Sequence, residues 1–536
     1  MRFNFSRYGL TGGEKVLQRI FEIIPGLTSW TVLIGMIILS FTSPLIAVVI
    51  IIAFDLYWLL KLLYLTFFLV VSYIRLSIEK ETDWMSRINA LKDSTKPVTS
   101  KNKFSHLIYE GQLKNLIRKK GSYPSMDEIY QLVIIPIAKE AQDVVEPGIK
   151  SIINGTYPSK KIIVVLALEC RAPEDSKKGM SSLKDRYKDN FFDFLISIHK
   201  DNVAGESRVK GANATHAATE AAEYLKEKGI PFENVIVSCF DSDTVVSNKY
   251  FSCLTYNFIV CPERDRASFQ PIPVFYNNIW DVPGFARVLE TGSSFFQLIE
   301  ATNTEKLVTF SSHSMSFKAL VEVGYWPVDM ISDDSAIFWK AYLHFDSKYK
   351  VVPMYTTVSM DIVAANSWWR TIVNEYKQKR RWAWGVENFP IVMRGFLKNK
   401  NITFYNKFRL AFKLFEGHIA WATWAFLLTI IGWLPVFFAG RHFQTSVLYY
   451  SEPRIAGIIF NLAFFSLATS IILSLCLLPR DKVKNPILKR ALLAFQWLFI
   501  PLIILFLSAL PALDAQTRLM LGKRMEFWVA DKKSKT

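Results

Sequence analysis

Two aspartates one residue apart, Asp241 and Asp243, directly follow an apolar run, 234–240, that is predicted to be a buried strand. Two carboxylates at this spacing in a turn can coordinate one divalent cation, which then holds the charged oxygens of a diphosphate. A diphosphate that leaves a nucleotide-linked sugar needs its charge neutralised in this way. The alternative is an ordinary solvated turn, because Asp-x-Asp pairs are common. The oxygen ligands favour Mg²⁺ or Mn²⁺ as the cation.

A second acidic pair, Asp333 and Asp334, follows Ser332 and precedes a segment that is predicted to be helical from about Ser335. In one interpretation the pair caps this helix, because Ser and Asp are favoured at helix N-termini. In the other, a carboxylate takes the proton from an acceptor hydroxyl during a direct displacement. The local sequence alone leaves both interpretations open.

A third group of residues, Gln378, Arg381 and Trp382, lies on one side of a predicted helix by its spacing. A guanidinium binds a diphosphate through two parallel hydrogen bonds, and an aromatic face packs well on a sugar ring. The alternative is a basic helix at a membrane surface, with the tryptophan as an interface anchor.

The order of these motifs resembles that of the membrane-integrated family 2 glycosyltransferases, a group that includes cellulose and hyaluronan synthases. The family's Gln-x-x-Arg-Trp motif is matched completely, and its Thr-Glu-Asp motif corresponds to Ser332-Asp333-Asp334. Its Phe-x-Val-Thr-x-Lys gating loop corresponds to residues 527–532, with Ala530 in place of threonine. The resemblance covers nearly the whole chain and is strongest from 131 to 390.

The resemblance implies an inverting transfer in which Asp334 is the catalytic base, while Asp241 and Asp243 hold the metal, Mg²⁺ or Mn²⁺. It implies that the donor nucleotide and diphosphate are bound by Glu140, Glu169, Lys210, Asp241, Gln378, Arg381, Trp382 and Lys532. It implies that the acceptor is bound by Trp382, Asp333 and His313. The alternatives are a helix start for Lys210, a loop acid for Glu169 and a structural role for His313.

Apolar strands alternate with helices in the middle of the chain. Strands are predicted over 132–136, 161–168 and 234–240, and helices over 141–153 and 210–228. This alternation predicts an α/β domain with a doubly wound, mostly parallel sheet, which the resemblance identifies as a glycosyltransferase-A domain. Ligands of such sheets bind at the carboxyl ends of the strands, where Glu140, Glu169 and Asp241 fall.

Most of the long apolar runs lie near the two ends of the chain, and apolar residues make up 51% of the 536 residues. Membrane-spanning helices are predicted over 23–41, 45–65, 415–438, 455–478 and 491–513, and an amphipathic interfacial segment over 404–414. The chain is therefore divided into an N-terminal hairpin region (1–76), a polar linker (77–130), a catalytic domain (131–400), an interfacial and C-terminal membrane region (401–513) and a tail (514–536). A multi-pass protein of the cell membrane with a cytoplasmic catalytic domain is expected, and its first span is expected to be retained as an anchor.

The three C-terminal spans raise a problem of topology. An odd number of crossings would separate the tail from the catalytic domain, although the gating-loop motif requires both on one side. We therefore expect the last apolar run, which contains Pro501 and Pro511, to be bent or re-entrant.

The net charge of +17 does not indicate nucleic-acid binding, because many basic residues flank apolar runs as in cytoplasmic loops. The five cysteines show no zinc-ligand spacing. The leading hypothesis is the processive synthesis of a β-linked polysaccharide from a nucleotide sugar, and the resemblance implies that this donor is a UDP-sugar. The alternatives are a single transfer to a membrane lipid, a catalytically silent nucleotide-binding scaffold and a basic protein that binds the membrane surface.

Overall fold

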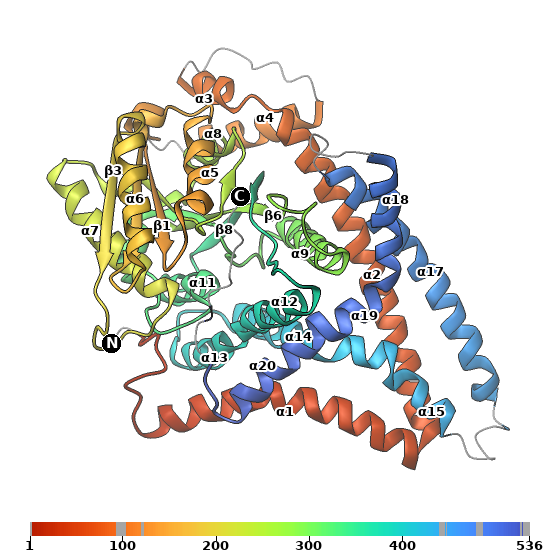
Figure 1. Ribbon diagram of the computed structural model, residues 1–536. Helices are drawn as coiled ribbons and strands as arrows, with labels where there is room; N and C mark the ends of the chain where they lie inside the picture. Colours follow the sequence, from red (N-terminus) through yellow and green to blue (C-terminus); the bar gives the residue numbers. More distant parts are fainter. Residues whose placement is uncertain are drawn as a thin grey trace.

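The computed structural model describes residues 3–92, 103–118, 123–438, 445, 447–478, 486–525 and 528. Figure 1 shows an α/β domain beside a group of long helices that comes from both ends of the chain. The domain is built from the middle of the chain, so the helices before it and after it meet on one side.

The domain is organised around one eight-stranded mixed sheet with the strand order β3-β2-β1-β4-β7-β6-β8-β5. The strands are β1 (Tyr130–Ile137), β2 (Ile162–Glu169), β3 (Asp193–His199), β4 (Val235–Cys239), β5 (Val245–Val246), β6 (Ala267–Val274), β7 (Ser314–Ser316) and β8 (Lys350–Ser359). Strands β3, β2, β1 and β4 are parallel, and β6 is parallel to β8. Strand β7 is antiparallel to β4 and β6, and β5 is antiparallel to β8. The predicted fold class, an α/β domain with a mostly parallel sheet beside apolar helices, is confirmed.

Both faces of the sheet are covered, as expected for parallel strands. Leu132 and Ile134 of β1 pack into one apolar cluster, whereas Val133 and Ile135 pack into the cluster on the other face. The first face is covered by α7 (Lys210–Glu227), α10 (Phe317–Val323), α11 (Asp333–His344) and α13 (Asn388–Lys398). The second is covered by α5 (Gln142–Ile153), α6 (Glu174–Tyr187) and α8 (Tyr250–Val260).

The prediction of a polar linker over 77–130 is wrong in part, because this segment contains two helices that pack against the α/β domain. These are α3 (Trp84–Lys92) and α4 (Lys103–Arg118), and both pack against α8. Trp84, Ile88 and Leu91 are buried at helical spacing. The segment is polar overall, so its composition did not indicate that these three residues form an apolar stripe on one face of a helix.

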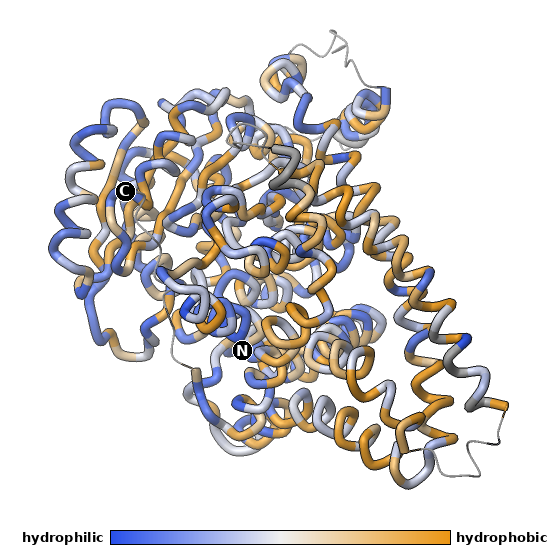
Figure 2. Tube along the Cα trace, turned by 45° about the vertical axis from the view of Figure 1, so that its right-hand side comes forward, coloured by the Kyte–Doolittle hydropathy of each residue, from blue (hydrophilic) through white to orange (hydrophobic). Residues whose placement is uncertain are grey.

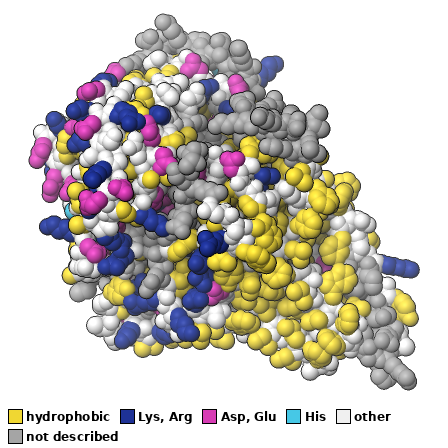
Figure 3. All heavy atoms as spheres, in the orientation of Figure 1, with side chains coloured by type: hydrophobic (Ala, Val, Ile, Leu, Met, Phe, Trp, Pro, Cys, Tyr) yellow, Lys and Arg dark blue, Asp and Glu magenta, His cyan; other side chains and the backbone are white. Residues whose placement is uncertain are grey.

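Within the described residues, four helical segments are long and apolar enough to cross a membrane: Gly12–Thr42, Pro44–Glu81, Gly457–Leu477 and Ala491–Met520. The first two are α1 and α2, and the third is part of α17 (Val447–Leu477). Figure 2 shows that hydrophobic residues dominate these helices. In Figure 3 an apolar surface covers the helical group, and lysines and arginines gather beside it toward the α/β domain. This distribution is typical of a membrane-embedded surface with a basic border.

The bend in the C-terminal region lies elsewhere than predicted. Residues 404–414 are not a separate interfacial helix, because α14 (Phe404–Thr429) runs through them and then meets Ile431–Phe437 at an angle of 47°. The last run is not a hairpin, since Ala491–Met520 is one helical segment. Pro501 and Pro511 lie in the first turns of α19 (Ile500–Ile504) and α20 (Leu510–Met520), where a missing N–H is tolerated. A π-helical turn, Leu505–Ala509, joins the two.

The helices at the two ends of the chain pack tightly against each other. In α1, the Ser29 hydroxyl donates to Gln516 Oε1 at 2.7 Å, and the Trp30 indole donates to Thr517 Oγ1 at 2.9 Å. A Cβ atom on Gly26 would lie 2.8 Å from the Gln516 carbonyl oxygen. The backbones of α1 and α20 therefore approach as closely as small residues in membrane helices allow.

Candidate active site

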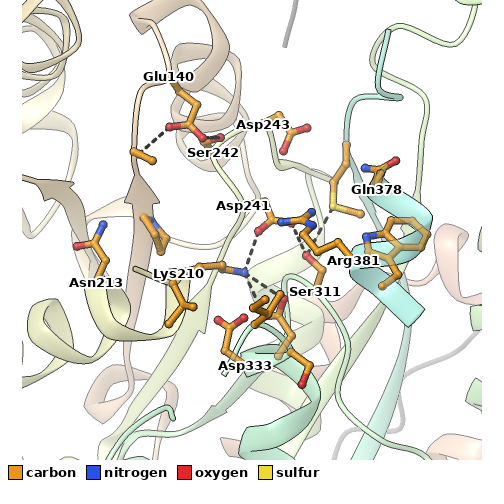
Figure 4. Close-up of a pocket in the computed structure, with 18 of the residues that line it drawn as sticks. Glu140, Lys210, Asn213, Asp241, Ser242, Asp243, Ser311, Asp333, Gln378 and Arg381 are labelled. Carbon is orange, nitrogen blue, oxygen red and sulfur yellow. Dashed lines mark hydrogen bonds and ion pairs between the residues drawn. The ribbon is translucent and has the colours of Figure 1, made fainter. Parts of the chain in front are cut away.

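A cleft at the carboxyl ends of β1, β2 and β4 brings the predicted site residues together (Figure 4). Residues from both acidic motifs and from the Gln-x-x-Arg-Trp motif line it: Glu140, Glu169, Lys210, Asp241, Asp243, Asp333, Asp334, Gln378, Arg381 and Trp382. The cleft lies where ligands of doubly wound sheets bind.

Lys210, the first residue of α7, occupies the centre of the cleft. Its Nζ lies 2.8 Å from Asp241 Oδ1 and 3.1 Å from Asp334 Oδ1. Burial alone would lower the pKa of Lys210, but the carboxylates of Asp241 and Asp334 outweigh it and raise that pKa well above its usual value. The ammonium group is therefore charged and joins the two acidic motifs, a role that the sequence did not indicate.

The Asp-x-Asp pair is held by backbone and side-chain contacts around the end of β4. Asp241 accepts a hydrogen bond from the Ser311 hydroxyl. Asp243 is 5% exposed and accepts the Asp361 backbone N–H at 2.9 Å. The Asn277 amide donates to the Asp243 carbonyl oxygen at 2.9 Å. These contacts fix the pair at the edge of the cleft.

The chemistry of these side chains fits a hard divalent cation. Both aspartates supply oxygen ligands, which Mg²⁺ and Mn²⁺ prefer. Within the described residues no group of three or more His, Cys, Asp or Glu side chains could hold a metal. A cation bound by Asp241 and Asp243 would thus need further ligands from water or from a bound phosphate, which is usual for Mg²⁺.

The Asp333-Asp334 pair begins α11, but its side chains do not cap the helix. Ser332 occupies the N-cap position without a side-chain capping bond, and Asp334 instead contacts Lys210 through both oxygens at 3.1 and 3.2 Å. Asp333 is 3% exposed, and burial followed by the charge of Asp334 raises its pKa well above the usual value. The raised pKa favours the protonated form of Asp333, whereas Asp334 lies against the Lys210 ammonium.

The loop in front of α11 leaves no room beside Gly211. A Cβ there would lie 2.4 Å from the Pro327 carbonyl oxygen and 2.9 Å from the Asp333 Cβ. We expect Gly211→Ala to destabilise the protein by about 1–3 kcal/mol, because α7 and the loop must separate. Thermal unfolding in detergent measures this.

Gly292→Ala in α9 (Gly284–Thr302) is the matched control, because no atom lies within 4 Å of its added Cβ. Alanine there should be neutral or stabilising, since it is the better helix former. An equal loss of stability in both variants would contradict the expected crowding at Gly211.

Helix α12 (Trp368–Ala383) supplies the side of the cleft opposite to Lys210 (Figure 4). The Trp382 ring packs edge-on against Phe310, and its centroid lies 5.9 Å from that of Phe275. Lys379 Nζ lies 3.7 Å from the Trp382 ring centroid. Gln378 Oε1 is buried without a hydrogen-bond partner in the described part of the protein. The helix thus presents an aromatic face and an open acceptor to a polar ligand.

Glu140 and Glu169 lie at the ends of β1 and β2. Glu140 Oε2 accepts the backbone N–H groups of Ala138 and Lys139 at 2.7 and 2.9 Å. Glu169 lies beside Arg171 and His199, and burial raises its pKa. Both carboxyl groups line the cleft, so each keeps the position that the sequence predicted.

Two predicted residues do not join this set. His313 does not line the cleft, is fully buried, and its Nδ1 lies 3.0 Å from the Phe310 carbonyl oxygen. His313 thus has a structural position behind Asp334 and not the predicted contact with an acceptor. Burial also lowers its pKa. Lys532 and most of the gating-loop motif lie outside the described residues. Trp528 of this motif is described, and the centroid of its ring lies 5.4 Å from Lys377 Nζ.

Sequence reasoning missed two supporting residues. Ser311 binds Asp241, and Glu387 binds the loop in front of Asp333. The signal that could have found Ser311 is its place two residues before His313, a predicted acceptor contact. Glu387 carries a weaker signal, an acid within an apolar helical stretch that follows Trp382.

The chain belongs to the family described as glycosyl transferase family group 2, whose profile matches residues 236–510, just over half of the chain. The protein is therefore a glycosyltransferase, as its motifs predicted.

Curated relatives include poly-beta-1,6-N-acetyl-D-glucosamine synthases. That of Staphylococcus epidermidis is 24% identical over 295 residues, which are 53% of this chain and 60% of the relative. That of Staphylococcus aureus strain MSSA476 is 23% identical over 329 residues, which are 61% of this chain and 69% of the relative. The chain thus spans about three fifths of the length of the first relative.

Two solved structures show some likeness to this chain. The mannosyltransferase PcManGT from Pyrobaculum calidifontis, in complex with GDP-Man and Mn²⁺, aligns with a TM-score of 0.40 and 12% identity over 85% of this chain and 100% of that chain. Residues 1–349 of S. aureus TarS, in complex with UDP-GlcNAc, align with a TM-score of 0.34 and 12% identity over 74% of this chain and 93% of that chain.

Proposed function

We propose that this protein is an inverting membrane glycosyltransferase that moves a sugar from a UDP-sugar to a hydroxyl group and extends a β-linked polysaccharide. The observation that carries the proposal is the position of Lys210 between Asp241 and Asp334. It joins a carboxylate suited to the donor diphosphate with a carboxylate suited to the acceptor hydroxyl.

The proposed step is a direct displacement. Asp334 takes the proton of the acceptor hydroxyl, and the hydroxyl oxygen attacks the anomeric carbon of the sugar. The bond between that carbon and the diphosphate breaks, and the diphosphate leaves with the electron pair. An α-linked donor then gives a β-linked product.

The charged side chains of the cleft have separate tasks in this step. Lys210 and Arg381 line it as cations and would stabilise the leaving diphosphate. Asp241 and Asp243 would hold a divalent cation, Mg²⁺ or Mn²⁺, which neutralises diphosphate charge when bound. Trp382 offers an aromatic face to the acceptor sugar. Glu140 and Glu169, at the strand ends, would contact the nucleoside.

The similarity to the polysaccharide synthases supports a polymer as the product. The apolar helices support a multi-pass position in the cell membrane, with the cleft on the cytoplasmic side where nucleotide sugars are made. A single transfer to a membrane lipid uses the same chemistry, so the size of the product has to separate the two.

The test is UDP release by the purified protein in detergent, with a panel of UDP-sugars that includes UDP-GlcNAc and with Mg²⁺ or Mn²⁺. We expect release with one sugar, its loss on chelation of the metal, and a long product in the same reaction. A product with one added sugar on a lipid would select the lipid acceptor. Nucleotide binding without release from any donor would support a silent scaffold and overturn the proposal.

A further inference from the structure

The segment ahead of α1 lies against the loop that precedes Asp333 and Asp334. The Ser6 hydroxyl donates to Asp329 Oδ2 at 2.6 Å, and the Ser6 carbonyl oxygen accepts from Arg394 Nη2 at 2.8 Å. Arg7 Nη1 lies 3.5 Å from Glu387 Oε2. Ser6 and Arg7 therefore contact residues that lie next to the candidate active site and do not line the cleft.

Glu387 connects this segment to the loop. Its Oε1 accepts the backbone N–H groups of Ile331 and Ser332 at 2.8 and 2.9 Å and the Ser332 hydroxyl at 2.9 Å. Its Oε2 accepts the Trp384 indole N–H at 3.0 Å. One carboxylate that is 3% exposed thus fixes the two residues directly in front of Asp333.

Arg7 supplies the opposite charge for this buried carboxylate. Burial raises the pKa of Glu387, whereas Arg7 and the donors on Ser332 and Trp384 lower it. The other charged groups nearby are engaged elsewhere, because Asp329 binds Ser6 and Arg394 binds Ser6 and Gln18. Burial outweighs these contacts and the pKa of Glu387 is raised, so loss of Arg7 would raise it further.

We propose that Arg7 is a positioning residue for sugar transfer, because it holds the Glu387 carboxylate that orients the loop in front of Asp334. The inference rests on the proposed function and adds to it a requirement for the segment that precedes the first membrane helix. Arg7 forms an ion pair with Glu387, which does not line the cleft, so the effect of Arg7 on the reaction is indirect.

The experiment compares the pH profile of UDP release for the full-length wild type, Arg7→Gln and Arg7→Lys at saturating donor. In Arg7→Gln we expect about tenfold slower release at pH 6.5, partial recovery at pH 8.5 and an unchanged KM for the UDP-sugar, because higher pH ionises Glu387 again. Arg7→Lys should restore most of the rate. A profile parallel to that of the wild type at every pH would overturn the inference.

Arg524→Gln is the matched control, because it removes the same charge from a contact with Tyr8 of the same segment, where Arg524 Nη1 lies 2.7 Å from the tyrosine hydroxyl. It should leave the pH profile unchanged, and a profile like that of Arg7→Gln would also overturn the inference.

A second readout keeps the inference separate from the proposed function. If the wild type releases no UDP, the proposed function fails, but thermal unfolding still tests Arg7. Without Arg7 the folded-state pKa of Glu387 is raised further above its unfolded value, so stability falls as pH rises above that unfolded value. The melting temperature of Arg7→Gln should therefore drop below that of Arg524→Gln between pH 5 and 8, and equal melting temperatures throughout would overturn the inference.

Discussion

Replacing Asp334 by asparagine is expected to lower UDP release by about 10²–10⁴-fold, the usual contribution of a general base. Asparagine keeps the shape of the side chain but cannot take a proton from an acceptor hydroxyl. Lys210 retains its contact with Asp241, at 2.8 Å, so it keeps one of its two ion pairs. The measurement is the release rate at saturating donor, together with the binding of UDP to the variant.

Asp185→Asn, on the exposed side of α6, is the control for this substitution and should release UDP at the wild-type rate. Nucleotide binding should survive in Asp334→Asn, which distinguishes lost chemistry from lost folding. A variant that still works at a tenth of the wild-type rate or faster would show that another group accepts the proton.

A second large effect is expected at a buried group of charges behind Trp382. Lys379 Nζ lies 2.8 Å from Glu290 Oε2, and the two side chains are 3% and 1% exposed. Glu290→Gln removes the carboxylate that pairs with the buried Lys379 ammonium, and beside it leaves Glu375, whose pKa is raised well above its usual value. Breaking such a pair costs about 3–5 kcal/mol, which thermal unfolding in detergent should reveal as a markedly lower melting temperature.

Glu375→Gln is the comparison for this variant, because Glu375 is buried on α12 one turn before Lys379. Burial, followed by the charge of Glu290, raises the pKa of Glu375 well above its usual value, which favours the protonated form of Glu375. The wild type therefore loses stability as pH rises above about 4.3, the ordinary value for glutamate, and Glu375→Gln does not. At pH 8 this variant should melt at or above the wild-type temperature. If both glutamine variants were destabilised equally, the assigned protonation states would be wrong.

The sequence predicted the parts of the fold that depend on local periodicity. The predicted strand over 132–136 lies within β1, and the helix predicted from Lys210 begins at that residue. Because the parallel strands end at one edge of the sheet, the motifs that follow them meet in the cleft. The antiparallel insertion of β7 between β4 and β6 was not predicted, since a three-residue strand has too little pattern to detect.

The contacts between distant residues could not be predicted. The sequence indicated Lys210 as a donor contact, but its position between Asp241 and Asp334 depends on how α7 and α11 pack. Arg7 and Glu387 lie in segments without a motif, and only the folded chain brings them together. The bend after Thr429 was also hidden, because Pro501 and Pro511 were the stronger signals of a break.

The packing of α1 against α20 also sets an order for the assembly of the protein. Ser29 and Gln516 are 487 residues apart, so synthesis at ~5–20 residues per second separates their emergence by roughly 25–100 s. During this interval the polar and small side chains on α1 have no α20 to contact. Helices α1 and α2 and the whole α/β domain are therefore complete before α20 is made. If synthesis stopped before Gln516, the acidic motifs of the cleft would already be present. Helix α1 would still lack its contact with α20.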